Sequence, residues 1–192
     1  MEYRYETDNF PVIRAKWFTD VTDKRTVRVI VIHTMEAAKK ANTAENVANY
    51  FKTTKSKVSA HLCIDNDSIV QCVFDNDVAY AAPGVNRDGI QLELAGFANQ
   101  TAADWTDAYN TLLLEKAANA AAQYCLKYDI PRAHLTDKQL KDGKKGIIGH
   151  VQASRMYPPN AGHHDPGENF PWDFFIERVE FHYTERKRKM DS

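Results

Sequence analysis

The feature that most constrains the fold is an almost unbroken apolar run, Val-Arg-Val-Ile-Val-Ile-His-Thr at residues 27–34. β-Branched runs of this kind form strands buried on both faces, which lie at the centre of a sheet flanked by helices. Polar residues at the ends of such strands face the crevice where open α/β sheets bind ligands. His33 stands at this end of the run. For a lone histidine a hydrogen-bonded structural role is the commoner explanation, so His33 needs partners elsewhere to indicate a site.

A second histidine follows another short apolar run. Residues 146–149, Gly-Ile-Ile-Gly, predict a buried strand that ends at His150, and a Pro- and Gly-rich loop then carries His163-His164-Asp165. Side chains in such a loop are not needed for packing. His33, His150 and Asp165 together make the donor set of an open zinc site, whose fourth position is left for water or substrate. His163 or His164 could instead be the third ligand, because spacing along one loop does not separate these options.

The remaining periodic segments predict a mixture of helices and strands. Residues 42–45, Asn-Thr-Ala-Glu, have the form of a capping box, and Asn66-Asp67 tolerates the turn between two strand-like runs. We expect helices at about 43–53, 105–128 and from 172 onward, and strands at 58–65, 68–73 and 89–96, the last with one face solvated or lining a cleft. These elements predict a single α/β domain with a mixed central β-sheet flanked by helices.

The overall composition argues against several classes of partner. Twenty-five basic and twenty-six acidic residues leave a formal charge of −1, so the total favours neither nucleic acid nor an anionic membrane surface. The three cysteines, Cys63, Cys72 and Cys125, are too few and too scattered for a disulfide framework. The first residues lack the apolar core of a secretory signal, and no stretch approaches the roughly 20 apolar residues that span a bilayer. We therefore expect no stable membrane association.

Hydrolysis of an amide or ester is the reaction that such a metal site favours, because the cation acidifies water and polarises a carbonyl. Glu93, in the predicted strand at 89–96, is placed to orient the water and take its proton, although a solvated strand residue explains Glu93 alone equally well. His163 could stabilise the oxyanion or protonate the leaving amine. His61 is as readily a buried structural histidine as a site residue. Gly-x-Ser-x-Gly and His-Glu-x-x-His motifs are absent, which counts against serine hydrolases and thermolysin-like proteases.

Several short blocks occur in the order typical of one enzyme family. They are Val31-Ile32-His33-Thr34-Met35-Glu36, Ser59-Ala60-His61, Ala79-Tyr80-Ala81-Ala82-Pro83-Gly84, Gln91-Leu92-Glu93-Leu94-Ala95-Gly96, Gly149-His150 and His163-His164-Asp165-Pro166-Gly167. The ordered set covers roughly residues 27–176. It resembles the zinc-dependent N-acetylmuramoyl-L-alanine amidases of the type 2 amidase and peptidoglycan-recognition-protein superfamily, and it is similar to catalytic domains of bacteriophage endolysins.

This resemblance implies a mixed sheet with flanking helices, Zn²⁺ held by His33, His150 and Asp165, and Glu93 as the catalytic carboxylate. The implied reaction is hydrolysis of the amide between N-acetylmuramic acid and the L-alanine of the peptidoglycan stem peptide. Relatives carry a lysine two residues before the third ligand, where this chain has His163. An oxyanion role for His163 is still implied, with its pH dependence left open.

We expect Thr34, His61 and Tyr80 to contact the muramyl peptide substrate. Residues 1–26 are interpreted as an arm packed on the domain, 27–182 as the catalytic domain and 183–192 as a charged, frayed tail. The leading hypothesis is a monomeric lytic amidase, made in a host cytoplasm without a signal peptide, that reaches the cell wall after a partner permeabilises the membrane. The alternatives are a cytoplasmic amidase that recycles soluble muropeptides and a non-catalytic peptidoglycan-recognition module.

Overall fold

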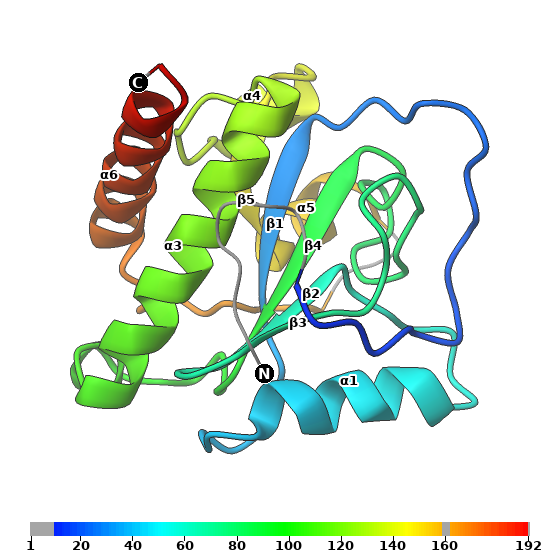
Figure 1. Ribbon diagram of the computed structural model, residues 1–192, viewed down its shortest axis with the longest axis horizontal. Coiled ribbons are helices and arrows are strands. Elements are labelled where there is room, and N and C mark those ends of the chain that lie inside the picture. Colours follow the sequence, from blue (N-terminus) through cyan, green and yellow to red (C-terminus); the bar gives the residue numbers. More distant parts are fainter. Residues whose placement is uncertain (1–9, 159–161, 192) are drawn as a thin grey trace.

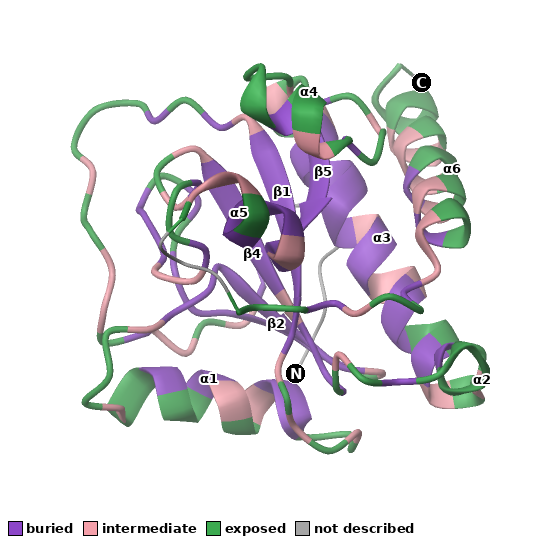
Figure 2. Cartoon of the chain, turned by 180° about the vertical axis from the view of Figure 1, so that it is seen from behind, coloured by how far each residue is buried: buried purple, intermediate pink, exposed green. Residues whose placement is uncertain are grey.

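A five-stranded mixed sheet forms the centre of the fold, in the order β3-β2-β4-β1-β5 (Figure 1). The computed structural model describes residues 10–158 and 162–191. The strands are β1 Val29–Thr34, β2 Leu62–Ile64, β3 Ile69–Gln71, β4 Gly89–Leu94 and β5 Gly146–Gly149. β1 is parallel to β4 and β5, β4 is parallel to β2, and β2 and β3 form the predicted antiparallel hairpin. Every residue of β1 is buried, as its β-branched run predicts (Figure 2).

Helices cover both faces of this sheet. They are α1 Thr43–Thr53, α2 Ala102–Trp105, α3 Ala108–Tyr128, α4 Asp137–Lys141, α5 His150–Met156 and α6 Trp172–Met190. Successive strand residues point to opposite faces, so Ile30 and Ile32 pack with α3 and α6, whereas Val29 and Val31 pack on the face covered by α4 and α5. α1 covers the β2–β3 end of this second face. The predicted single α/β domain with a mixed, helix-flanked sheet is confirmed.

The helix predicted at about 105–128 is α3, which begins three residues later, at Ala108, and ends at Tyr128 as predicted. Thr101 and Asp104 form a capping box at the start of α2, and the Asp107 side chain accepts a hydrogen bond from the Asn110 backbone amide at the start of α3. Asp107 has extended backbone angles, with φ −68° and ψ 167°, which no helix interior accommodates. The Asp107 cap therefore sets the start of α3 and separates it from the short helix α2, which ends at Trp105.

The prediction of a frayed tail after residue 183 is wrong, because α6 continues to Met190. Contacts with the neighbouring helix α3 hold it. Arg178 forms an ion pair with Glu115, and Nε2 of His182 lies 2.8 Å from the same carboxylate. Further along, Nε of Arg186 donates to Oδ1 of Asn119 at 2.9 Å. These contacts extend the packing well into the charged segment.

One further prediction, about the end of a strand, is corrected, and another, about the face of a strand, is narrowed. His150 does not end a strand but is the first residue of α5, where the Gln152 side chain accepts a hydrogen bond from the Gly149 backbone amide at 3.0 Å. Of the two alternatives for the strand at 89–96, a solvated face is excluded, since Gln91 is fully buried and Glu93 is only partly exposed, and a face that lines a cleft is left. Both faces of this central strand are largely buried, as is usual for a parallel neighbour of β1.

Residues 10–26 run in an extended conformation against the domain. The Ile13 backbone amide donates to the Gln71 carbonyl at 3.0 Å, and Thr19 and Val78 exchange two backbone hydrogen bonds of 3.0 and 2.9 Å. Phe10 is buried in the core on the α3 side. The first nine residues of the expected arm lie outside the described residues. None of the described helices has the length and apolar character needed to cross a membrane.

Candidate metal centre

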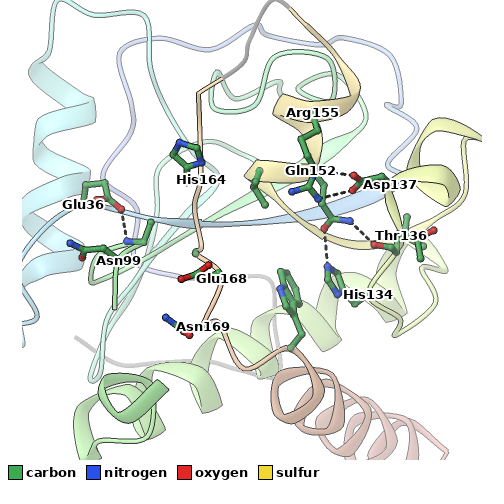
Figure 3. A pocket seen from close by; sticks show the side chains of 15 residues that line it. Glu36, Asn99, His134, Thr136, Asp137, Gln152, Arg155, His164, Glu168 and Asn169 are labelled. Atoms are coloured by element: carbon green, nitrogen blue, oxygen red, sulfur yellow. Dashed lines mark hydrogen bonds and ion pairs between the residues drawn. The ribbon is translucent and has the colours of Figure 1, made fainter. Parts of the chain in front are cut away.

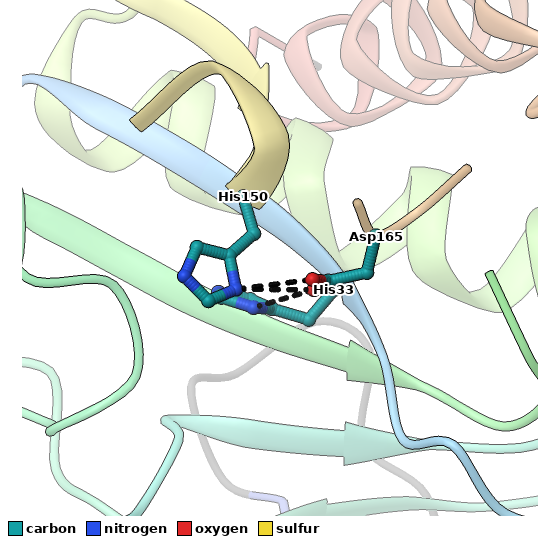
Figure 4. A group of neighbouring side chains, drawn as sticks. All are labelled: His33, His150 and Asp165. Carbon is teal, nitrogen blue, oxygen red and sulfur yellow. Dashed lines mark hydrogen bonds and ion pairs between the residues drawn. The ribbon is translucent and has the colours of Figure 1, made fainter. Parts of the chain in front are cut away.

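Three buried side chains from separate parts of the chain converge beyond the carboxyl ends of β1 and β5 (Figure 4). His33 comes from the end of β1, His150 from the start of α5 and Asp165 from the loop before α6. Nδ1 of His33 lies 3.1 Å from Oδ2 of Asp165, and Nδ1 of His150 lies 3.2 Å from the same oxygen. One donor atom from each residue lies within 4.8 Å of the other two. The structure thus brings together the three residues predicted as ligands.

The donor set and its spacing fit a metal ion. Nitrogen and oxygen ligands lie about 2.0–2.2 Å from a tetrahedral zinc, which puts neighbouring donor atoms about 3.3 Å apart. The His33–Asp165 and His150–Asp165 separations of 3.1 and 3.2 Å are close to this value. Both histidines present Nδ1 to Asp165, so the two rings and the carboxylate are aimed at one point. A cation at that point would have a donor atom from each of the three residues within reach, since these atoms lie within 4.8 Å of one another.

Without a metal, a proton supplies the positive charge of this cluster. Burial alone would lower the pKa of His33, but the hydrogen bond to Asp165 and the charge of Glu93 raise it to about 9. Burial alone would raise the pKa of Asp165, but hydrogen bonds from His150 and His33 hold it well below its usual range. Burial lowers the pKa of His150. At neutral pH an imidazolium, a neutral imidazole and a carboxylate therefore share the space.

Glu93 is an acidic side chain that lies on the strand next to His33 of this cluster. It pairs directly with His33 where β4 runs beside β1, and both residues point to the face opposite α3. Oε2 of Glu93 is buried without a hydrogen-bond partner among the described residues. Burial raises the pKa of Glu93 to about 7. A carboxylate of this kind is suited to accept a proton near neutral pH.

The two loop histidines separate in space. His163 stacks on His150 with ring centroids 3.9 Å apart, and its Nδ1 lies 3.9 Å from Oδ1 of Asp165. Its side chain is 53% exposed, so the ring lies between the cluster and solvent. His164 points elsewhere and lines an adjoining cavity (Figure 3). Of the two, His163 is the histidine beside the cluster.

The three residues expected to contact substrate occupy different environments. Thr34 is buried, and its hydroxyl donates to Oε1 of Glu36 at 2.7 Å. The Tyr80 hydroxyl lies 2.7 Å from the hydroxyl of Thr19. His61 is 0% exposed, so the expectation that it touches substrate is corrected. Its ring bonds to backbone groups in the core, where burial lowers its pKa to about 3.

A polar cavity of about 910 Å³ adjoins the cluster (Figure 3). Its walls include direct neighbours of the ligands in sequence, although none of the three ligands lines it. Asp137 accepts two hydrogen bonds of 2.8 Å from Arg155, and Oε1 of Gln152 lies 2.8 Å from Nε2 of His134. These residues were not predicted from the sequence. Nothing in it indicated that the polar segment before β5 contacts α5, a helix that was itself not predicted.

The fold and the cluster define a class: a hydrolase of α/β architecture with a candidate metal centre beyond the carboxyl ends of its central strands. A family model described as N-acetylmuramoyl-L-alanine amidase matches residues 23–168. The chain belongs to this family, and its activity is that of an N-acetylmuramoyl-L-alanine amidase, which acts on peptidoglycan. No curated protein matches it.

Solved structures of amidases and endolysins share the fold. The hydrolase AmiA of Staphylococcus aureus, in complex with its ligand, aligns with a TM-score of 0.67 at 17% identity over 93% of this chain and 85% of that one. The N-acetylmuramoyl-L-alanine amidase LysC of Clostridium intestinale aligns with a TM-score of 0.57 at 16% identity, covering 91% and 99%. A mutant endolysin from Bacillus subtilis gives 0.58 at 16% identity, covering 89% and 99%. The fold is thus shared at low sequence identity.

Proposed function

We propose that this amidase uses zinc held by His33, His150 and Asp165, and that Glu93 and His163 act on the substrate beside it. The observation that carries the proposal is the convergence of three buried donor atoms within 4.8 Å, directly beside Glu93 in the β1–β4 register. Two imidazoles and a carboxylate form a ligand set that suits zinc and leaves a position open. When bound, zinc would supply Lewis acidity, which polarises a carbonyl and makes water a better nucleophile.

Glu93 has the surroundings of a general base. Its Oε2, buried without a hydrogen-bond partner in the described part of the chain, is placed to accept a proton from the attacking water. The raised pKa of about 7 brings its proton affinity close to that needed at neutral pH, and a neighbouring cation would lower this pKa again. The strand fixes the position of the carboxylate, so little motion is needed during the reaction.

His163 has the exposure and position of a group that faces substrate. Its ring is held against His150 while half of its side chain remains open to solvent. From there an N–H could donate to the oxyanion that develops on the lactyl carbonyl, or pass a proton to the departing amine of L-alanine. We assign Thr34 and Tyr80 to the surrounding substrate surface.

The setting that we propose is cell-wall lysis by a monomeric enzyme that is made in a host cytoplasm and reaches peptidoglycan after the membrane is permeabilised. The wide polar cavity beside the cluster supports a polymeric substrate, because it offers room beyond the scissile bond. The charge of −1 offers no general attraction to membranes.

Mass spectrometry of the products from purified sacculi, with and without a chelator, tests these points together. The expected result is a new free L-alanine amino terminus that disappears with chelator and returns with zinc. Activity only on soluble muropeptides would identify a recycling enzyme instead of a lysin. Tight muropeptide binding without any product would identify a recognition module.

A further inference from the structure

The orientation of the His33 ring depends on what its second nitrogen binds. If Nδ1 is to offer a lone pair to a metal, the proton of the neutral imidazole must lie on Nε2. A buried N–H without an acceptor is costly, so this arrangement needs an acceptor facing Nε2. Metal-binding histidines commonly find one in a carboxylate, a carbonyl or water.

Gln91 provides that acceptor. Oε1 of Gln91 lies 2.9 Å from Nε2 of His33, and both side chains are almost completely buried. Gln91 lies on the same face of β4 as Gly89 and Glu93. A Cβ added at Gly89 would lie 2.7 Å from Nε2 of Gln91, so the amide occupies the space that the glycine leaves. Nε2 of Gln91 has no partner among the described residues, which leaves His33 as the polar contact of this side chain.

His61 holds the backbone of Gln91 in turn. The His61 backbone amide donates to the Gln91 carbonyl, and the Gln91 backbone amide donates to Nδ1 of His61, both at 3.0 Å. Because Nδ1 accepts, the proton of His61 lies on Nε2, which donates to the Asp77 carbonyl at 3.1 Å. Nη2 of Arg25 also lies 3.1 Å from this nitrogen, but it donates to a backbone carbonyl at 2.8 Å. Buried hydrogen bonds therefore link Asp77 to His61 and His61 to the backbone of Gln91, whose side chain contacts His33.

We propose that Gln91 is a positioning residue that fixes His33 as the Nε2–H tautomer with Nδ1 aimed at the metal, and that His61 holds Gln91 in place. The inference rests on the metal site proposed above. The opposite orientation of the amide would donate to Nε2 of His33 and leave the proton on Nδ1, where it would block coordination.

The test is zinc affinity, measured on the full chain by competition with a chelator of known affinity. Gln91→Met keeps the size of the side chain and removes the acceptor, and we expect zinc binding to weaken about 10- to 100-fold. Gln91→Glu restores an acceptor and should stay within a few-fold of the original protein. Gln71→Met is the matched control, because Gln71 is a buried glutamine on the edge strand β3 whose side chain donates to Val73 and Asp75. This control should leave zinc affinity unchanged even where it lowers stability.

Nitrogen NMR of the zinc-loaded protein gives a second readout, the tautomer of His33. A general loss of packing would not change which ring nitrogen carries the proton. The expected spectrum shows His33 protonated at Nε2. Zinc binding by Gln91→Met within twofold of the original protein, an Nδ1–H tautomer, or Gln91→Glu as weak as Gln91→Met would each overturn the role of Gln91. Failure of the original protein to bind zinc would overturn the proposed metal site and this inference with it.

Discussion

Glu93 of β4 lies directly opposite His33 of β1, in a parallel register that points both side chains to the face of the sheet opposite α3. The backbone hydrogen bonds between β1 and β4 thus position both His33, a candidate metal ligand, and Glu93, a candidate base. The distance between them is set by strand pairing rather than by a mobile loop, which favours a well-ordered site.

Replacing Glu93 by Gln should preserve zinc content and folding while lowering kcat/KM by about 10²- to 10⁴-fold, because the amide cannot accept a proton. Zinc content is measured by inductively coupled plasma mass spectrometry, and turnover by release of L-alanine amino termini. Glu180→Gln is the control and should leave turnover unchanged, since Glu180 lies on α6 and pairs with Arg132. Near-normal turnover of Glu93→Gln would assign the base to another group.

The pH profile of kcat/KM gives a separate check on Glu93. The ionised form is the active one, so activity should rise with pH through the pKa of this residue. That pKa is about 7 without metal, and a bound cation favours the ionised form. The acidic limb of the zinc enzyme should therefore lie below pH 7. A limb that stays unchanged in a residually active Glu93→Gln variant would mean that it reports a different group.

Asp165→Ala should abolish stoichiometric zinc binding and destabilise the metal-free protein. The carboxylate accepts hydrogen bonds from both His33 and His150, and removing one member of a buried charged cluster costs about 3–5 kcal/mol. Urea unfolding of the chelator-treated protein measures this cost. Asp137→Ala removes an exposed pair with Arg155 and should cost less than about 1 kcal/mol. Undiminished zinc in the Asp165 variant would reject this ligand.

The metal-free protein should lose stability as the solution becomes alkaline. Folding raises the pKa of His33 from 6.5 to about 9, so its contribution is complete below pH 6.5 and is lost as pH rises through 9. The loss should amount to about 3 kcal/mol at most. Zinc-saturated protein should show the opposite trend over neutral pH, because its ligands must shed protons to bind the ion. If the unfolding free energies of the metal-free and zinc-saturated forms changed with pH in the same way, this account would be contradicted.

His163→Ala should retain zinc and lower turnover by about 10-fold or more, because a hydrogen-bond donor to the developing charge is lost. His163→Lys should recover much of the loss, since the lysine ammonium group can also donate a hydrogen bond to the developing charge. His164→Ala is the neighbouring control, with its side chain in the adjoining cavity. Equal effects of the two alanine variants would argue for a general role of the loop.

The sequence indicated the most strongly patterned parts of this fold. The β-branched run before His33 predicted a central strand, and the periodic segment at 43–53 predicted the helix found at Thr43–Thr53, although the expected capping box does not form because Asn42 makes no side-chain capping hydrogen bond. His33, His150 and Asp165 could be grouped because strand ends and a Pro- and Gly-rich loop gather at one edge of an α/β sheet.

Other features depended on tertiary contacts that the pattern does not contain. The charged end of α6 is helical because Arg178 and Arg186 reach α3, whereas composition alone predicted fraying. The start of the long helix was predicted three residues too early, because the Asp107 cap was not recognised as its beginning. The sequence does show that Gln91 lies two residues before Glu93 and so shares its face of the strand. Its partner His33 could be identified only from the structure, in which β4 lies beside β1.

The shared register of β1 and β4 also limits how this enzyme can vary. Shifting β4 by one residue along β1 would send every side chain of the strand to the other face of the sheet. Leu92 would then face the ligands while Glu93 entered the apolar layer beneath α3. Insertions are therefore tolerable in the loops around these two strands but not within them. The backbone pairing of these two strands therefore decides which side chains the proposed site contains.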